Sequence, residues 1–266
     1  MITRYPDLWQ RGQPLGRPFI LGHRGASHAA PQNTLAAFRK AADVGADGIE
    51  LDVHLSRDGV PVVVHNNSVD ATTDGTGLVR ELTLAQLKAL DAGARFDVPD
   101  SGVSYAGERI PTLEEVLAEV GARVLVNIEL KAGQTVALVS AVVDLVRRME
   151  MADRVWFSSF KPYALYRARA LAPEIPCGLL YGPLNLGTLL LRPFTPHEAL
   201  HPYKDMLTER FVRRVQQRGV RVFTWTLDDP AVARKFAAWN VDGIITNEPA
   251  EILAAVEGRN PCEGFA

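Results

Sequence analysis

The chain has 266 residues, of which 47% are hydrophobic and 23% are charged, as in an ordinary globular protein that buries a sizeable core. Its formal net charge of −2 gives no electrostatic case for a nucleic-acid partner or an anionic membrane, so any work on an anionic substrate must come from local charge. The two cysteines, Cys177 and Cys262, lack metal-ligand spacing and favour a reducing compartment. Without a signal-peptide pattern or an apolar run long enough for a membrane span, the expected location is cytoplasmic.

Short apolar segments rich in β-forming residues recur along the chain and predict eight strands. Stretches with helical periodicity separate most of them. The predicted strands are 18–22, 47–55, 124–131, 155–159, 177–182, 199–203, 221–227 and 242–247, and the predicted helices are 34–44, 113–120, 135–149, 164–171, 209–218, 231–239 and 250–256. This alternation predicts a parallel sheet, and eight strands fit a single (β/α)8 TIM barrel domain over residues 1–266. An open, doubly wound sheet is the alternative.

One long connection interrupts the alternation. A further strand at 61–65 (PVVVH) is followed by residues 66–111 before the next predicted barrel helix. That length exceeds an ordinary loop, and the helix-like LTLAQLKAL lies within it. We therefore expect an inserted lid segment at about 66–111, after the second strand.

Ionisable residues stand at the ends of the predicted strands. In DGIELDVHL, alternation places Glu50, Asp52 and His54 on one face and the apolar residues on the other. Two buried carboxylates this close would repel each other, and a hard divalent cation with oxygen ligands would relieve that cost. The alternative is an edge strand with a solvated acidic face.

A second predicted strand, 124–131, also has ionisable residues near its end. VLVNIELK places Glu129 and Lys131 on one face, and Glu129 can join the first two carboxylates if the strands are neighbours. A plain ion pair between Glu129 and Lys131 is the alternative. His23 and Arg24 follow the first strand, and His65 closes PVVVH. Cations, carboxylates and imidazoles at one end of a barrel are the components of metal-assisted phosphoryl chemistry.

The ordered set of motifs resembles the glycerophosphodiester phosphodiesterase family over about residues 18–256. The matching stretches are HRGASHAAPQNTLAAF, GADGIELDVHLSRDGVPVVVHN, TTDGTG, IPTLEEVL, NIELK, FTWTLD and DGIITNEP. The resemblance implies a (β/α)8 barrel with an insertion after His65. It also implies metal-dependent hydrolysis of small-molecule glycerophosphodiesters to glycerol 3-phosphate and an alcohol.

Carried over by motif, His23 and His65 are the expected general acid/base pair. The resemblance assigns one Mg²⁺ or Ca²⁺ to three carboxylates, those of Glu50, Asp52 and Glu129. It leaves open whether water or the glycerol 2-hydroxyl attacks the phosphorus, and it favours the hydroxyl.

The remaining assignments concern substrate binding. By resemblance Arg24 and Lys131 bind the phosphate, and Trp225 in FTWTLD lines the substrate pocket, with barrel packing as its alternative role. The family usually has His-Asp where this chain has His65-Asn66. It also has a basic residue where this chain has Asp70-Ala71. These departures bear on the identity of the preferred alcohol.

Two other functions remain as alternatives to hydrolysis of soluble diesters. One is phospholipase D-like action on lysophospholipids, for which the apolar stretch 184–191 (LNLGTLLL) is the candidate lipid-contacting surface. Core packing or self-association is the alternative role of that stretch. The other function is a catalytically silent barrel that binds phosphorylated ligands.

Overall fold

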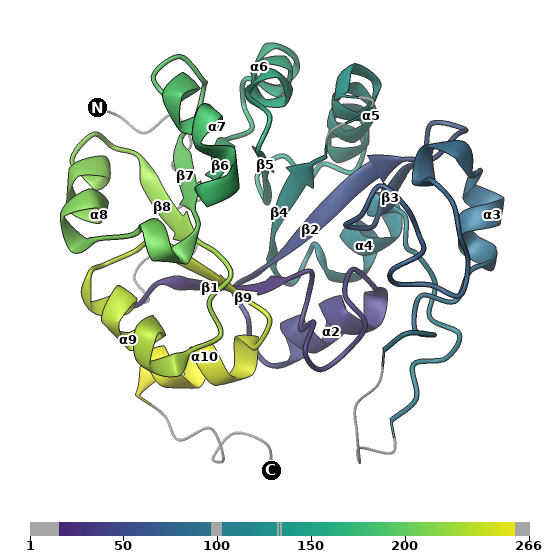
Figure 1. Ribbon diagram of the computed structural model, residues 1–266, viewed down its shortest axis with the longest axis horizontal. Coiled ribbons are helices and arrows are strands. Elements are labelled where there is room, and N and C mark those ends of the chain that lie inside the picture. Colours follow the sequence, from purple (N-terminus) through teal and green to yellow (C-terminus); the bar gives the residue numbers. More distant parts are fainter. Residues whose placement is uncertain (1–15, 97–102, 132, 134, 259–266) are drawn as a thin grey trace.

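The fold is a closed barrel of eight parallel strands (Figure 1). The computed structural model describes residues 16–96, 103–131, 133 and 135–258. Around the barrel the strands are β1 (Phe19–His23), β9 (Gly243–Thr246), β8 (Arg221–Thr224), β7 (Ala199–Pro202), β6 (Cys177–Tyr181), β5 (Val155–Ser159), β4 (Leu125–Leu130) and β2 (Gly48–Leu55). Because β1 pairs with both β9 and β2, the sheet closes. The predicted TIM barrel is therefore confirmed, and the open-sheet alternative is wrong.

Helices surround the barrel in the ranges expected from the sequence (Figure 1). They are α2 (Leu35–Asp43), α4 (Leu113–Val120), α5 (Thr135–Arg148), α6 (Pro162–Leu171), α8 (Glu209–Gln216), α9 (Pro230–Ala238) and α10 (Pro249–Glu257). Three of these helices begin at a proline, where the missing N–H costs little. The stretch after β6, where no helix was predicted, forms the 3-10 helix η2 (Pro183–Asn185) and α7 (Leu186–Leu191).

Alternation along the strands divides the buried side chains into two sets. One set packs between the strands and the outer helices and forms the main core. The other fills the barrel interior near the amino-terminal ends of the strands and consists of Phe19, Leu21, Leu125, Trp156, Ala199, Phe223 and Ile245. Polar and charged side chains occupy the opposite, carboxyl-terminal end of the interior.

The short strand β3 (Pro61–Val63) lies outside the barrel order. It pairs antiparallel with the end of β2, with Val53 opposite Val63. The chain therefore turns back on itself, and the Val64 N–H donates to the Asp52 carbonyl at 3.0 Å. This return places the following residue, His65, beside the carboxylates of β2 rather than at the end of a barrel strand.

The connection from β3 to α4 contains the 3-10 helix η1 (Val79–Glu81) and α3 (Leu84–Ala89). It has a small apolar core of its own, formed by Val62, Val64, Val69, Val79, Leu87, Ala92 and Ile110. Its Tyr105 hydroxyl donates to the Ala29 carbonyl at 2.8 Å and fixes the segment to the loop between β1 and α2. That this segment acts as a lid stays a prediction.

Candidate active site

Three carboxylates meet inside the carboxyl-terminal end of the barrel. The register pairs Asp52 on β2 with Glu129 on β4, and Glu50 lies two residues earlier on the same face of β2. All three side chains are buried, and one oxygen of each lies within 4.8 Å of the others. The alternative of a solvated acidic edge strand is therefore wrong.

Cationic and amide groups surround Asp52. The Lys131 Nζ lies 2.8 Å from Asp52 Oδ1 and 2.8 Å from Glu129 Oε1, so it bridges the two strands. Arg24 Nε lies 3.4 Å from Asp52 Oδ2, and Asn33 Nδ2 donates to that same oxygen at 2.8 Å. The ion pair between Glu129 and Lys131 exists, but it belongs to a larger cluster.

Asn33 is a site residue that the sequence analysis missed. Both Asn33 and Arg24 adopt left-handed backbone conformations, with φ values of 59° and 58°. Asparagine tolerates this conformation better than most residues, whereas arginine adopts it at some cost. Arg24 begins the loop between β1 and α2 and Asn33 lies near its end, and the Asn33 N–H donates to the Arg24 carbonyl at 2.9 Å, so both side chains reach Asp52.

The three carboxyl groups differ in pKa. Burial, reinforced by Asp52 and Glu129, raises the pKa of Glu50 well above its usual value, and burial raises that of Glu129 to about 7. Burial also opposes ionisation of Asp52, but Lys131 and Arg24 outweigh it and lower the pKa of Asp52. Two of these three buried carboxyl groups have raised pKa values because too little positive charge lies near them. A hard divalent cation, which prefers oxygen ligands, would supply that charge.

A chain of hydrogen bonds orients His23. Its Nδ1 lies 2.7 Å from Asn247 Oδ1, while Asn247 Nδ2 donates to Asp228 Oδ2 at 2.7 Å. Because the amide nitrogen faces Asp228, the amide oxygen faces the imidazole and can only accept a hydrogen bond from it. His23 therefore carries its proton on Nδ1 and keeps Nε2 free. Neither Asn247 nor Asp228 was predicted from the sequence.

His65 has a similar arrangement with its own neighbour. Its Nδ1 lies 2.6 Å from Asn66 Oδ1, and Nε2 of His54 contacts the carbonyl oxygen of His65 at 3.2 Å. Burial lowers the pKa of His65, and burial together with Arg24 lowers that of His23 to about 4. Both imidazoles are accordingly neutral at pH 7.

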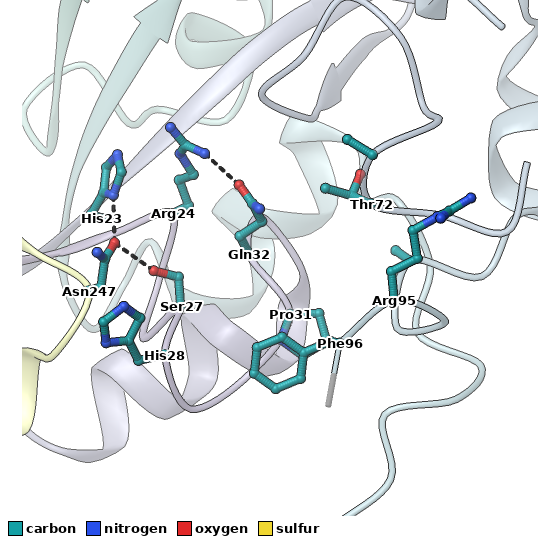
Figure 2. A pocket seen from close by; sticks show the side chains of 12 residues that line it. His23, Arg24, Ser27, His28, Pro31, Gln32, Thr72, Arg95, Phe96 and Asn247 are labelled. Carbon is teal, nitrogen blue, oxygen red and sulfur yellow. Dashed lines mark hydrogen bonds between the residues drawn. The ribbon is translucent and has the colours of Figure 1, made fainter. Parts of the chain in front are cut away.

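Two cavities open beside this cluster, one next to each histidine. The first has a volume of about 310 Å³ and lies between His23, Arg24 and residues of the insertion such as Thr72. Figure 2 shows His23, Asn247 and Ser27 on one side of it, with Thr72 and Arg95 across from them. The second has a volume of about 420 Å³ and is lined by His65, Lys131, Phe160 and others.

Trp225 lies just past β8, in an aromatic group at the barrel mouth. Its indole Nε1 donates to the His201 carbonyl at 2.8 Å, and its ring packs edge-on against those of Phe160 and Tyr203, each with centroids 5.4 Å away. Phe160 lines the second cavity. Contact of Trp225 with substrate stays a prediction. His201 itself is fully buried.

Comparisons with known proteins agree with this geometry. Residues 23–251 match the profile of the Glycerophosphoryl diester phosphodiesterase family. A glycerophosphodiester phosphodiesterase of Caldanaerobacter subterraneus is 38% identical over 245 residues, covering 90% of this chain and 98% of the relative.

Solved structures of similar proteins have the same fold. An Oleispira antarctica phosphodiesterase in complex with the product sn-glycerol-3-phosphate superposes with a TM-score of 0.79 at 29% identity, covering 91% of this chain and 97% of that one. A glycerophosphodiester phosphodiesterase from Agrobacterium tumefaciens superposes with a TM-score of 0.75 at 30% identity, covering 89% and 99%.

Proposed function

The chain belongs to the glycerophosphoryl diester phosphodiesterase family and is a glycerophosphodiester phosphodiesterase, and we propose that it uses one divalent cation and two histidines to release glycerol 3-phosphate and an alcohol. The product bound to the Oleispira antarctica relative supports glycerol 3-phosphate as the phosphorylated product here. The observation that carries the proposal is a buried cluster of three carboxylates with two oriented histidines beside the adjoining cavities, His23 held at Nδ1 by Asn247 and His65 with its Nδ1 against Asn66.

The cation would be Mg²⁺ or Ca²⁺, held by the carboxylates of Glu50, Asp52 and Glu129. When bound, it would supply a Lewis acid for a phosphate oxygen. Lys131 and Arg24 already lie against Asp52, so their charges would also face the phosphate, and they would bind its remaining oxygens.

The histidines would move the protons. One imidazole Nε2 takes the proton of the attacking hydroxyl, whether that belongs to water or to the glycerol 2-hydroxyl. A bond forms from its oxygen to phosphorus and the ester bond to the alcohol breaks. The other imidazole takes up a proton from solvent when the anionic phosphodiester binds beside it and gives that proton to the leaving oxygen, while the proton taken from the attacking hydroxyl returns to solvent. The two cavities would hold the two ester substituents of the phosphate.

The test is enzyme-coupled detection of glycerol 3-phosphate from glycerophosphocholine, first with metal stripped and then with Mg²⁺ or Ca²⁺ restored. Activity should disappear and return. His23→Ala and His65→Ala should each lose roughly 10²- to 10⁴-fold in kcat. His197→Ala serves as the matched control because its Nδ1 contacts the Thr195 carbonyl, in the connection before β7, and His197 lines neither of the two cavities. Histidine variants that fold normally and turn over at the parent rate would refute the two-histidine scheme.

A further inference from the structure

Exposed large apolar side chains gather in one region of the described structure. Leu184, Leu190 and Phe194, in the connection from β6 to β7, are 97%, 80% and 74% exposed. Leu191 in the same connection and two tyrosines of α6, Tyr163 and Tyr166, are also exposed. We call the six residues the apolar lip. Single exposed apolar residues are common on globular proteins, whereas a contiguous group of them often marks an interaction site.

The apolar lip belongs to the catalytic end of the barrel. Its chain leaves the carboxyl end of β6 at Tyr181, and carboxyl strand ends also carry the carboxylates. The Thr188 hydroxyl donates to the Phe160 carbonyl at 3.2 Å, and Phe160 lines the cavity beside His65. The Tyr166 hydroxyl donates to the Phe194 carbonyl and joins α6 to the connection. Figure 1 shows α7 and α6 next to each other above β6 and β5.

Basic residues flank the lip along the chain. In the described stretch 159–195 the basic residues Lys161 and Arg192 flank the exposed apolar groups, and Lys161 is itself exposed. The single acidic residue of that stretch, Glu174, is paired with Arg147 of α5. The whole chain carries a net charge of −2, so this positive edge is a local feature. Exposed leucine and phenylalanine beside basic groups is the pattern of proteins that rest on anionic lipid surfaces.

We propose that the apolar lip docks on the surface of an anionic phospholipid bilayer and holds the mouth of the barrel against it. Leu184, Leu190 and Phe194 enter the boundary between head groups and acyl chains, while Lys161 and Arg192 face the anionic head groups. The site then meets phosphodiesters at the place where lipid deacylation releases them. Docking does not depend on the metal or on the histidine pair.

The experiment is co-sedimentation of the full chain with vesicles of phosphatidylcholine, with and without phosphatidylglycerol. Binding should be about 30-fold stronger to the anionic vesicles, as expected from two basic groups, and should weaken with added salt. The triple variant Leu184→Ser, Leu190→Ser and Phe194→Ser should lose it. The matched control is Val103→Ser with Val136→Ser, which removes exposed valines outside the lip and should bind like the parent.

Turnover of soluble glycerophosphocholine by the same proteins separates the proposal from the assigned chemistry. The lip variant should keep the parent rate, which shows that it is folded and that its catalytic site is intact. Equal sedimentation of parent and lip variant would overturn the proposal. So would a parent that ignores vesicles and forms a dimer by analytical ultracentrifugation that the lip variant does not form, because a second copy would then cover the lip.

Discussion

Asn247 decides which nitrogen of His23 is available for proton transfer. Replacing it with leucine keeps a similar volume but removes the acceptor for Nδ1–H, so both tautomers become accessible. We expect Asn247→Leu to lower kcat about 10- to 100-fold, the usual effect of losing such a supporting contact, with little change in KM. The ring ¹⁵N shifts of His23 should show mixed tautomers, which a purely structural defect would not produce.

A matched control for that variant exists at the other end of the barrel. Gln216 Nε2 donates to Asp242 Oδ2 at 2.9 Å, an amide–carboxylate contact like that between Asn247 and Asp228. Gln216→Leu should leave kcat and the ring shifts of His23 unchanged. Equal loss of activity in both variants would show that Asn247 acts only through stability.

The raised pKa of Glu129 implies that the affinity for the cation depends on pH. Burial raises its pKa to about 7, so below that pH the carboxyl group is protonated and must lose the proton before it can bind a metal. Because the pKa of the neighbouring ligand Glu50 is also raised, Mg²⁺ or Ca²⁺ affinity should rise with pH through about 7. Titration calorimetry in two buffers of different ionisation enthalpy would measure the released proton. Affinity that does not vary between pH 6 and 8 would contradict this assignment.

At the scale of elements, α4 depends on its first turn. The Thr112 hydroxyl accepts from the Glu115 N–H at 3.1 Å, and the Glu115 carboxylate accepts from the Thr112 N–H at 2.8 Å. Thr112→Ala should lower the free energy of unfolding by about 1 kcal/mol, measured by urea denaturation, with kcat unchanged. Thr112→Ser keeps the acceptor and should remain near the parent. A loss shared by both variants would assign the effect to the threonine methyl group.

The same elements show how much could be predicted from the sequence. Strands and helices were predicted because apolar spacing and prolines record local preferences, and the carboxylates followed from alternation along β2 and β4. A strand ending near His65 was predicted, but its length and its pairing were not, since PVVVH forms a three-residue strand that pairs antiparallel with β2 outside the barrel. Asn247 and Asn33 could not be found in this way. Their contacts depend on β1 lying beside β9 and on a left-handed turn, and neither has a local pattern.

At the scale of the whole molecule, buried histidines set the response to acid. Burial lowers the pKa of His201 to about 3, against 6.5 for an exposed histidine. As pH falls below 6.5 the unfolded chain takes up a proton that the folded chain refuses, so stability decreases until about pH 3. His201→Phe should lose less stability than the parent between pH 7 and 5.

Comparison of the two proteins isolates His201 from the other groups. The raised pKa values of Glu50 and Glu129 act in the opposite direction over part of this range, and His23 acts in the same direction, but all three are common to both proteins. Urea denaturation at several pH values provides the measurement. Parallel curves for parent and variant would mean that His201 is protonated as readily when folded as when unfolded.

Closure of the barrel also has a consequence for when the protein becomes active during its synthesis. His23 lies on the first strand, and the residue that orients it, Asn247, follows the last one. A ribosome that has delivered β1 through β8 has already supplied every proposed metal ligand and both histidines. The imidazole of His23 still lacks its partner at that stage. Nascent chains should therefore remain inactive until β9 emerges and inserts between β8 and β1, and the start of catalysis would then report the end of folding.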